Sequence, residues 1–404
     1  MSNLESKQMR RRLNYCKKIK LVLGALIVAF IISLFSACFR PTKTNEIKVG
    51  VIAPLTGNVS KYGIGALNGI ELYIEEINAE GGINGKNIKL VKYDDEGVAL
   101  KSIDGYNFLI DQKVVAIINA TTSIPALAIS GRAFDDKVPM VVAIATANEI
   151  TYDSKNDILF KNVFRMSITD TSQGEKLGKF ASNIIKAKTA CIIYSPENDY
   201  SRDLKESFEL ESKKRGIEIL GIESFSEQTN DFRSQLLRIS NVKPDVIFVP
   251  HYYETVSLIL KQAENFPIKG SFLGADGWSS IINLLNNLKL AKDLHYCTVF
   301  SKDEPRDIVE KFSANYENKF SVYPNTFAAN GYDSAKILVV SIQRALSKNI
   351  KQSDDLKEKI IKELKNIELE CVTGRITFDE FNNSIRDVCI IQIRKGKEEF
   401  WGKF

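Results

Sequence analysis

The sequence predicts an α/β protein with two lobes, each built on a doubly wound parallel sheet. Its 404 residues are enough for two or three domains that each bury a core. Between residues 47 and 300, short β-branched runs alternate with longer helical patterns, which is typical of parallel sheets covered by helices on both faces. The alternation starts again near Ile168 and the chain later returns to long helices. We therefore expect a hinged pair of lobes with a cleft between them.

Eight short runs of apolar and β-branched residues predict the strands of these sheets. They are Ile47–Ala53, Ile88–Tyr93, Val114–Asn119, Met140–Ala143, Ala190–Tyr194, Val246–Pro250, Ser271–Gly274 and Tyr296–Phe300. Two further runs near the C-terminus, Gly374–Phe378 and Val388–Arg394, predict two strands joined by a polar turn at Asp379–Ser384.

Apolar residues at helical spacing predict the helices between these strands. The first helix carries such residues from Leu67 to Ile77 and ends at Gly81-Gly82. Comparable patterns cover Ile124–Phe134, Thr255–Phe266, Asn325–Ser347 and Asp355–Asn366. From this order we expect residues 47–165 with about 298–375 to form the N-terminal lobe. Residues 166–297 with about 376–404 would form the C-terminal lobe.

Residues 1–37 have the pattern of a secretory signal peptide. Seven basic residues precede a mostly apolar run, Leu21–Phe35, which is shorter than the roughly 20 residues that span a bilayer. The ending Ser36-Ala37-Cys38 resembles the bacterial lipobox, in which the cysteine is acylated, although Phe35 stands where the lipobox prefers Leu. We expect residues 1–37 to be removed, Cys38 to carry lipid and residues 38–46 to form a tether; the alternative is a retained single-span anchor. Either way, the body lies outside the cytoplasm, anchored to the cell membrane or in the periplasm.

Charge and residue counts exclude several function classes. The formal net charge is +5, but residues 1–37 hold seven of the 55 basic residues and one of the 50 acidic ones. The remainder has 48 basic and 49 acidic residues, so it carries no bulk positive field for nucleic acid. The only two histidines, His251 and His295, argue against a His-rich metal site or a Ser-His-Asp triad, and we expect no cofactor.

The four cysteines of the body give no framework of disulfides or metal ligands. Cys191 and Cys297 lie inside apolar strand-like runs, where cysteine commonly behaves as a small buried hydrophobe. No C-x-x-C spacing occurs, so zinc and thioredoxin-like sites lack support. Export would permit disulfides, and we assign no pairs among Cys191, Cys297, Cys371 and Cys389.

A series of short motifs follows along the chain in a fixed order. The motifs are Leu55-Thr56-Gly57, Tyr62-Gly63, Gly69-Ile70-Glu71-Leu72, the run from Ile77 to Gly85, Asp94-Asp95, Ala145-Thr146, Ser172-Gln173-Gly174, Asp199-Tyr200, Tyr252-Tyr253, Gly274 to Trp278 and Gly374 to Asp379. In this order they resemble the Leu/Ile/Val-type periplasmic substrate-binding proteins of ABC importers. The resemblance implies the type I periplasmic-binding-protein fold, with three crossovers between the lobes. It also implies a receptor, not an enzyme, that closes on a small amino acid, branched-chain or aliphatic, and delivers it to a permease and its ATPase.

The loop Ala120-Thr121-Thr122-Ser123 is the candidate site for the ligand's carboxylate. It precedes Ile124-Pro125 and the next helix, and hydroxyls with free N–H groups at a helix N-terminus bind anions without an Arg. The alternative is that Thr121 or Ser123 only caps the helix. Ala120 stands where close relatives of the family have a ligand-contacting Ser, which leaves more of the task to Thr121, Thr122 and the backbone.

Two further loops follow strand ends, where ligands bind in such sheets. The resemblance implies that the Thr146 hydroxyl contacts the ligand and that a nearby backbone carbonyl, at Ala145, contacts its ammonium; the alternative is an ordinary strand-end Thr. Asp276 follows the run Ser271–Gly274, and the resemblance implies that its carboxylate pairs with the ammonium. The alternative for Asp276 is an Asx-turn residue.

Aromatic residues would complete the site. Tyr62, Tyr200 and Tyr252 match family aromatics of both lobes and offer apolar faces with a polar tip, or are half-buried surface residues. Trp278 either covers the side-chain pocket or packs inside its lobe. We expect His251 to be a loop or core residue.

Other patterns favour structural roles or rival functions. Asp94 and Asp95 suggest paired catalytic acids, but their position before a helix favours capping. Gly81–Asn87 fails the spacing of a phosphate loop, and no G-x-S-x-G or H-E-x-x-H occurs. Two alternatives on the same fold are a ligand-sensing subunit and a binder of amides, urea or aromatic acids; an exported hydrolase is the enzymatic rival.

Overall fold

The computed structural model describes residues 46–285, 294–347, 353–394 and 396–404. The predicted signal peptide, Cys38 and all of the tether but Glu46 lie outside these residues. Over the described residues, no helix is both long enough and apolar enough to cross a membrane.

The first sheet is wholly parallel. Its strand order is β2-β1-β3-β4-β7, and the chain places β1 in the middle by pairing Val49 with both Leu90 of β2 and Ala116 of β3. The strands are β1 (Glu46–Ala53), β2 (Asn87–Asp94), β3 (Ala116–Asn119), β4 (Met140–Val142) and β7 (Val163–Arg165). All residues of β3, β4 and β7 are buried, as in a sheet that helices cover on both faces.

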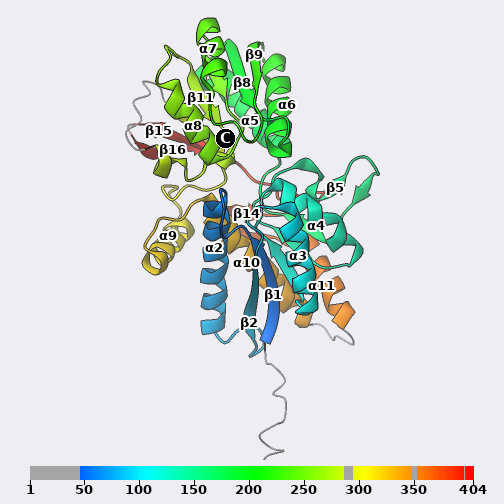
Figure 1. Cartoon of the computed structure of the whole chain (residues 1–404). Helices are drawn as coiled ribbons and strands as arrows, with labels where there is room; N and C mark the ends of the chain where they lie inside the picture. Colours follow the sequence, from blue (N-terminus) through cyan, green and yellow to red (C-terminus); the bar gives the residue numbers. More distant parts are fainter. Residues whose placement is uncertain (1–45, 286–293, 348–352, 395) are drawn as a thin grey trace, which may run out of the picture. The chain divides into compact units, whose positions relative to one another are not determined.

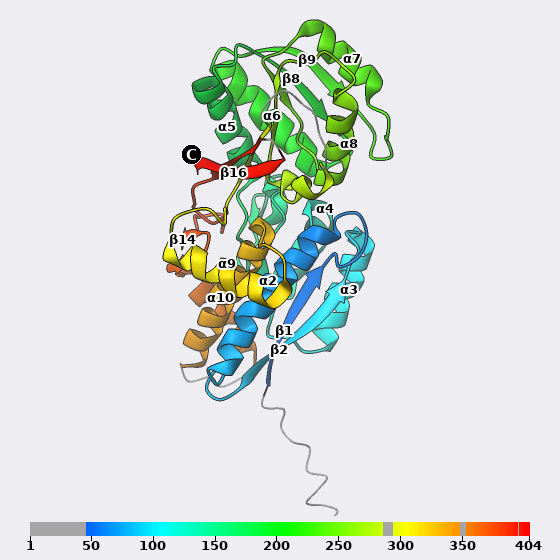
Figure 2. The same ribbon diagram turned by 90° about the vertical axis from the view of Figure 1, so that its left-hand side faces the viewer.

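Helices α2 (Ser60–Ala79) and α10 (Thr326–Leu346) cover one face of this sheet, and α3 (Ala99–Asp111) and α4 (Ser123–Asp135) cover the other (Figure 1). Successive residues of β3 alternate between the two layers: Ile118 packs in the cluster of α2 and α10, and Ile117 in the cluster of α3 and α4. Figure 2 shows α9 (Asp307–Phe320) crossing the outer side of α2 and α10. The last helix is α11 (Ser353–Lys365).

Helices α2 and α10 approach each other through glycine. A Cβ atom on Gly69 would lie 2.0 Å from the carbonyl oxygen of Ala328, and one on Gly331 would lie 2.1 Å from that of Ala66. Neither position has room for a side chain. The pair of glycines therefore fixes how closely the two backbones pack.

The second sheet has the order β16-β15-β12-β11-β10-β8-β9. Strands β8 (Thr189–Tyr194), β9 (Glu218–Ser224), β10 (Val246–Phe248), β11 (Ser271–Gly274) and β12 (Leu294–Thr298) are parallel; β15 (Cys389–Arg394) and β16 (Lys397–Lys403) add antiparallel to β12. Helices α5 (Asp170–Phe180) and α6 (Asp199–Lys214) cover one face, and α7 (Arg233–Val242) and α8 (Tyr253–Ala263) cover the other.

The chain passes between the two sheets three times. It leaves β7 for α5, returns after β12 to α9 and α10, and leaves again after β14 (Gly374–Ile376) for β15. We call the first sheet with its helices the first lobe and the second sheet with its helices the second lobe. The exact lobe boundaries given above stay a prediction.

All eight predicted strands are confirmed, but the prediction for the C-terminal pair was wrong in its pairing. Gly374–Phe378 supplies β14, which pairs with β13 (Leu369–Cys371) and not with β15. The reason is the turn at Val372-Thr373, whose two N–H groups donate to the buried Asp333 carboxylate at 2.9 and 2.8 Å. Strand β15 instead pairs with β12 and with β16, and β16 was not predicted.

Candidate ligand-binding site

A cavity lies between the carboxyl ends of strands from both lobes, where parallel sheets bind ligands. It holds about 230 Å³ of empty space, including the part that is open to solvent. Its lining within the described chain is Tyr62, Thr122, Ser123, Ile144, Ala145, Thr146, Tyr200, Tyr252, Asp276, Gly277 and Phe327. Eight of the ten side chains expected from the sequence are in this set, and Thr121 and Trp278 are not.

The first lobe contributes neutral hydrogen-bonding groups to the cavity. Strand β3 ends at Asn119 and α4 begins at Ser123, with Thr122 as its N-cap residue. The N–H groups in the first turn of a helix have no intrahelical partner, and no side-chain hydrogen bond caps this helix. The Ser123 hydroxyl accepts hydrogen bonds from the N–H groups of Thr146 and Ala147 at 3.4 and 3.3 Å. Two neighbouring loops are thereby joined into one polar edge.

Thr121 serves the loop and not the cavity. Its hydroxyl donates to the carbonyl oxygen of Thr122 at 3.1 Å, and its N–H donates to Asn119 Oδ1 at 3.1 Å. The side chain is fully buried. Thr121 therefore shapes the loop that presents Thr122 and Ser123.

Side chains of β7 and the residues after it hold the loop that carries Ala145 and Thr146 through hydrogen bonds to its backbone. The buried Arg165 guanidinium donates to the carbonyl oxygen of Thr146 at 2.8 Å and also to that of Ala147. The Ser167 hydroxyl donates to the carbonyl oxygen of Ala145 at 2.5 Å. These carbonyl oxygens already accept hydrogen bonds within the protein, and the Thr146 side chain remains on the cavity wall.

The second lobe contributes the charged group. Asp276 follows β11 in a 3-10 turn, and its carboxylate accepts a hydrogen bond from the Tyr200 hydroxyl at 3.0 Å. The Tyr200 hydroxyl also accepts from the N–H of Gly277 at 2.8 Å, which fixes the turn. Burial raises the pKa of Asp276 to about 6, and its hydrogen bonds with Tyr200 and Gln173 oppose this shift. Such a carboxylate is suited to a positively charged ligand group.

A second buried acid, Asp170, lies close to Asp276 and was not predicted. It is the first residue of α5, just beyond the end of β7, and none of its surface is exposed. Neither carboxylate oxygen has a hydrogen-bond partner that meets normal geometry among the described residues. Burial raises its pKa well above the ordinary value, and the charge of Asp276 adds to this, whereas Thr146 and Arg165 oppose it. Its place after a strand of the first sheet was the available signal, hidden because Thr169-Asp170 resembles a helix cap.

Aromatic rings close the cavity and join the lobes. The Tyr62 hydroxyl, on α2, donates to the carbonyl oxygen of Gly277 at 2.5 Å and accepts from the N–H of Tyr253 at 3.2 Å. The rings of Tyr200 and Tyr252 are stacked, with their centroids 4.9 Å apart, and the ring centroids of Tyr62 and Phe327 are 4.5 Å apart. Phe327, Ile144 and Gly277 were not predicted, because nothing in an apolar residue's local sequence marks it as cavity lining.

Trp278 packs inside the second lobe. It is fully buried, its indole N–H donates to the carbonyl oxygen of Val249 at 2.9 Å, and its ring fills the space over Gly274. His251 contacts Glu227 at 3.1 Å and lies outside the cavity, in accord with a loop or core role. Asp94 accepts a hydrogen bond from Leu55 N–H, and Asp95 accepts one from the Ser102 hydroxyl on α3. The expected capping role was wrong, because the N-cap residue of α3 is Val98 and no side-chain bond caps this helix.

The cysteines and the possible metal ligands of the described residues form no further site. Cys191, Cys297, Cys371 and Cys389 are buried and form no disulfide. Among the residues that the structure describes, no three His, Cys, Asp or Glu side chains gather as metal ligands. The cavity is therefore characterised by one neutral polar edge, one acidic edge and aromatic walls.

Comparisons with known proteins follow the same outline. Residues 46–398 match the sequence model of the family described as periplasmic binding protein. The Leu/Ile/Val-binding protein BraC3 of Rhizobium johnstonii is 26% identical over 348 residues, which cover 85% of this chain and 90% of that protein. A leucine binding protein, LivK, of Thermotoga maritima MSB8 is 28% identical with a TM-score of 0.79, covering 89% of this chain and 98% of that one. LivJ of Streptococcus pneumoniae, solved in complex with isoleucine, is 26% identical with a TM-score of 0.78, and the match covers 89% of this chain and 100% of that one.

Proposed function

Because the chain belongs to the periplasmic binding protein family, we propose that it is a receptor that binds a small amino acid outside the cytoplasm and delivers it to an ABC importer. The family and the type I fold expected from the sequence are confirmed. Membership identifies a substrate-binding protein and not an enzyme. A branched-chain or other aliphatic amino acid is supported by relatives that are named for leucine, isoleucine and valine.

The arrangement of opposite polar groups across one cavity carries this proposal. An amino acid presents a carboxylate and an ammonium, and burial of either is unfavourable unless it is paired. The first turn of α4, with Ser123 and Thr146, offers neutral donors for the carboxylate. Asp276 offers a buried carboxylate for the ammonium, and Asp170 is a second buried acid that interacts electrostatically with it.

The remaining walls favour an aliphatic side chain. Tyr62, Tyr252, Ile144 and Phe327 present apolar surface, and Asp276 is the only charged side chain in the described lining. A second charge on the ligand would lose its hydration without gaining a partner here. We therefore infer selectivity for leucine, isoleucine, valine or similar residues over acidic and basic amino acids.

Contacts from both lobes explain how binding would be communicated to the importer. A ligand that touches α4 of the first lobe and Asp276 of the second stabilises the arrangement in which both are near. The Tyr62–Gly277 hydrogen bond belongs to the same arrangement. We propose lobes of 47–165 with about 298–375 and of 166–297 with about 376–404, and recognition of the closed form by a permease with its ATPase.

The N-terminus supports anchoring. We propose cleavage after residue 37 and lipidation of Cys38, because Ser36-Ala37-Cys38 follows a basic and then an apolar stretch. Mass spectrometry of the protein purified from membranes of cells that express it should find a diacylglyceryl group on Cys38. A retained leader of unchanged mass would contradict this part of the proposal.

Calorimetric titration with leucine and two truncated analogues tests the function. We expect leucine to bind, whereas 4-methylpentanoate, which lacks the amine, and isopentylamine, which lacks the carboxylate, should each bind at least about 100-fold more weakly. Equal binding of 4-methylpentanoate would contradict a zwitterion site and favour the alternative of a receptor for organic acids. Absence of binding by all twenty amino acids would refute the proposal.

A further inference from the structure

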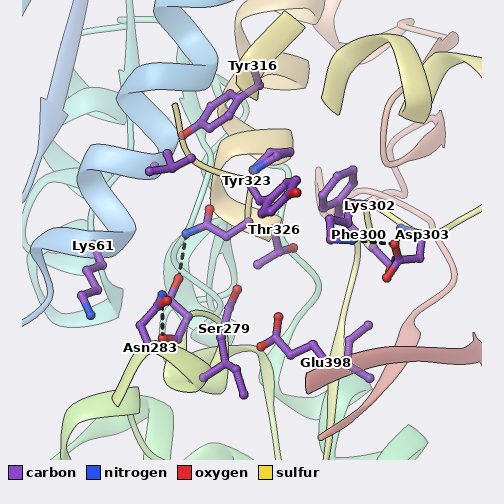
Figure 3. Close-up of a pocket in the computed structure, with 18 of the residues that line it drawn as sticks. Lys61, Ser279, Asn283, Phe300, Lys302, Asp303, Tyr316, Tyr323, Thr326 and Glu398 are labelled. Atoms are coloured by element: carbon purple, nitrogen blue, oxygen red, sulfur yellow. Dashed lines mark hydrogen bonds and ion pairs between the residues drawn. The ribbon is translucent and has the colours of Figure 1, made fainter. Parts of the chain in front are cut away.

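A second, larger cavity lies beside the first and shares no lining residue with it. It encloses about 1390 Å³ of empty space, including the part that is open to solvent. Figure 3 shows side chains that surround it. They come from α2, the segment 279–283, the ends of β12 and β16, and the loop between α9 and α10.

Interlobe hydrogen bonds separate the two cavities. Tyr62 and Gly277, whose bond was described above, line the first cavity, while their chain neighbours Lys61 and Ser279 line the second. The Asn325 amide donates to the Ser280 hydroxyl at 2.9 Å on the side of the second cavity. The second cavity is thus a separate space and not an extension of the amino-acid site.

Much of the wall of the second cavity is apolar. Phe300, Tyr316 and Tyr323 present rings to it, and Ile64 and Phe400 add aliphatic and aromatic surface. Tyr323 is 64% exposed and Ile64 is 43% exposed. A cavity with such walls and a few polar groups is typical of sites for small organic molecules.

The described lining of this cavity holds three acids, Asp303, Glu398 and Glu399, and two lysines, Lys61 and Lys302, so one negative charge is in excess. Lys302 pairs with Asp303 at 2.7 Å, and the Lys61 ammonium lies over the Tyr253 ring, 5.4 Å from its centroid. Glu398 and Glu399, by contrast, form no ion pair within the described residues. The Glu398 carboxylate accepts a hydrogen bond from the Tyr296 hydroxyl at 3.0 Å, and burial raises its pKa.

An unsatisfied hydroxyl lies on the same wall. Thr326, at the start of α10, is 3% exposed, and its Oγ1 has no hydrogen-bond partner in the described part of the chain. Buried polar atoms are rarely left without a partner in native proteins. In Figure 3, Thr326, Ser279 and Glu398 surround one region of the cavity. A single ammonium group there could pair with Glu398 and donate to Thr326.

The strand register places Glu398 on this wall. In β16, Glu398 is opposite Ile393 and Phe400 is opposite Ile391, so the two share the covered face of the strand. An inward-pointing acid on an edge strand also protects against edge-to-edge aggregation, and this is the competing explanation. That explanation requires no ligand and accounts for neither the apolar walls nor Thr326.

We propose that this cavity is a second small-molecule site, which binds an organic cation with an apolar body: the ammonium at Glu398 and Thr326, and the body against Tyr323 and Phe300. It is distinct from the amino-acid site, because the two share no residue and the second offers an acid and aromatic rings without a built carboxylate site. The proposal does not depend on which ligand occupies the first cavity.

Phenethylamine is the probe, because it has one ammonium, one aromatic ring and no carboxylate. We expect saturable binding to the purified full-length protein by calorimetry, both alone and in the presence of saturating leucine. Glu398→Gln keeps the size of the side chain and its hydrogen bond to Tyr296 but removes the charge, so it should weaken phenethylamine at least about tenfold. Glu358→Gln, an exposed acid on α11, is the matched control and should bind the probe as the parent does.

Each other outcome overturns the proposal. Binding that is lost in Asp276→Asn or displaced by leucine, and retained in Glu398→Gln, would place the amine in the first cavity. Absence of saturable binding, or equal binding by the parent and Glu398→Gln, would leave Glu398 as an edge-strand residue only. Leucine titrations of the same variants report separately on the proposed function, so a failure of either site is distinguishable from a failure of the other.

Discussion

The two lobes approach the first cavity with opposite chemistry. The edge from the first lobe is neutral: the first turn of α4, Ser123 and Thr146 present hydroxyl and N–H groups. The edge from the second lobe carries Asp276, a buried carboxylate whose pKa is raised to about 6. Neutral donors bind an anion without a buried charge in the ligand-free protein. The acid, by contrast, is buried without a paired cation in the ligand-free protein, which is unfavourable for its charged form. We expect substitutions in the second-lobe edge to change ligand affinity more than substitutions in the first-lobe edge. We also expect the pH dependence of affinity to come mainly from the second lobe.

The largest expected effect is that of Asp276→Asn. The variant keeps the shape of the site but removes the charge that pairs with the ammonium, so leucine affinity should fall about 100- to 1000-fold, or about 3–4 kcal/mol. Calorimetry at about pH 7 measures it, with the exposed Asp231→Asn as control. Unchanged affinity in Asp276→Asn would mean that the two edges do not differ as described.

The next largest effect is the pH dependence of leucine affinity, which should come from the acidic edge and not from the neutral one. Because the ammonium requires ionised Asp276, leucine affinity should fall about tenfold between about pH 7 and pH 5, with Asp170 acting in the same direction. The ligand-free protein should show the reverse trend. Its folded state holds a proton that the unfolded state, with an ordinary pKa of 3.8, has released, so its free energy of unfolding should rise as pH falls through 6. Urea denaturation of the ligand-free protein should show this slope, and saturating leucine, which keeps Asp276 ionised, should flatten it. Equal slopes with and without leucine would contradict the prediction.

Asp170→Asn should weaken leucine binding without lowering the stability of the ligand-free protein. The substitution removes an acid whose ionised form a bound ammonium would favour, so leucine should bind about tenfold more weakly. It also removes a buried carboxylate that has no hydrogen-bond partner of normal geometry among the described residues, so the free energy of unfolding of the ligand-free protein should stay equal or increase. A loss of stability together with unchanged affinity would assign Asp170 a structural role only.

The neutral edge should respond more mildly. Ser123→Ala removes one hydroxyl that accepts from Thr146 and Ala147, and we expect an affinity loss of about fivefold, or about 1 kcal/mol. The dependence of affinity on pH should remain that of the parent protein. A change in the midpoint of that dependence would show that the edges are electrostatically coupled.

Trp278→Phe should have the smallest effect on binding. Trp278 lies outside the cavity lining, so leucine affinity should stay within about twofold of the parent. The loss of the indole bond to Val249 and of packing over Gly274 should lower the free energy of unfolding by about 1–3 kcal/mol. Urea denaturation measures the second effect. A large loss of affinity without loss of stability would place Trp278 in the site.

The residues predicted from the sequence line the cavity where a polar or charged side chain follows the end of a strand. Thr122, Ser123, Thr146 and Asp276 follow strand ends directly, and parallel sheets bring such loops to one edge. Asp170 also follows a strand end, but a cap and a site acid have the same local pattern. Phe327 could not be predicted, because it reaches the cavity only through the packing of α10 on α2.

The same contrast applies to the fold. The strands of both sheets carry strong local patterns, and their order follows from short right-handed connections. The pairing of β14 with β13 depends on Asp333, a residue far away in the sequence, and β16 alternates polar and apolar residues around two acids. Trp278 could have packed inward or covered the cavity, and only the room above Gly274 decides between these positions.

The glycine contact between α2 and α10 has a consequence for ligand size. Tyr62 stands near the start of α2 and Phe327 near the start of α10, and the spacing of these helices is set by Gly69 and Gly331, which touch no ligand. Any methyl group at either glycine would separate the backbones and widen the gap between the two rings. We therefore expect a substitution at Gly69 or Gly331 to change the width of the cavity near Tyr62 and Phe327 without altering a residue that lines it.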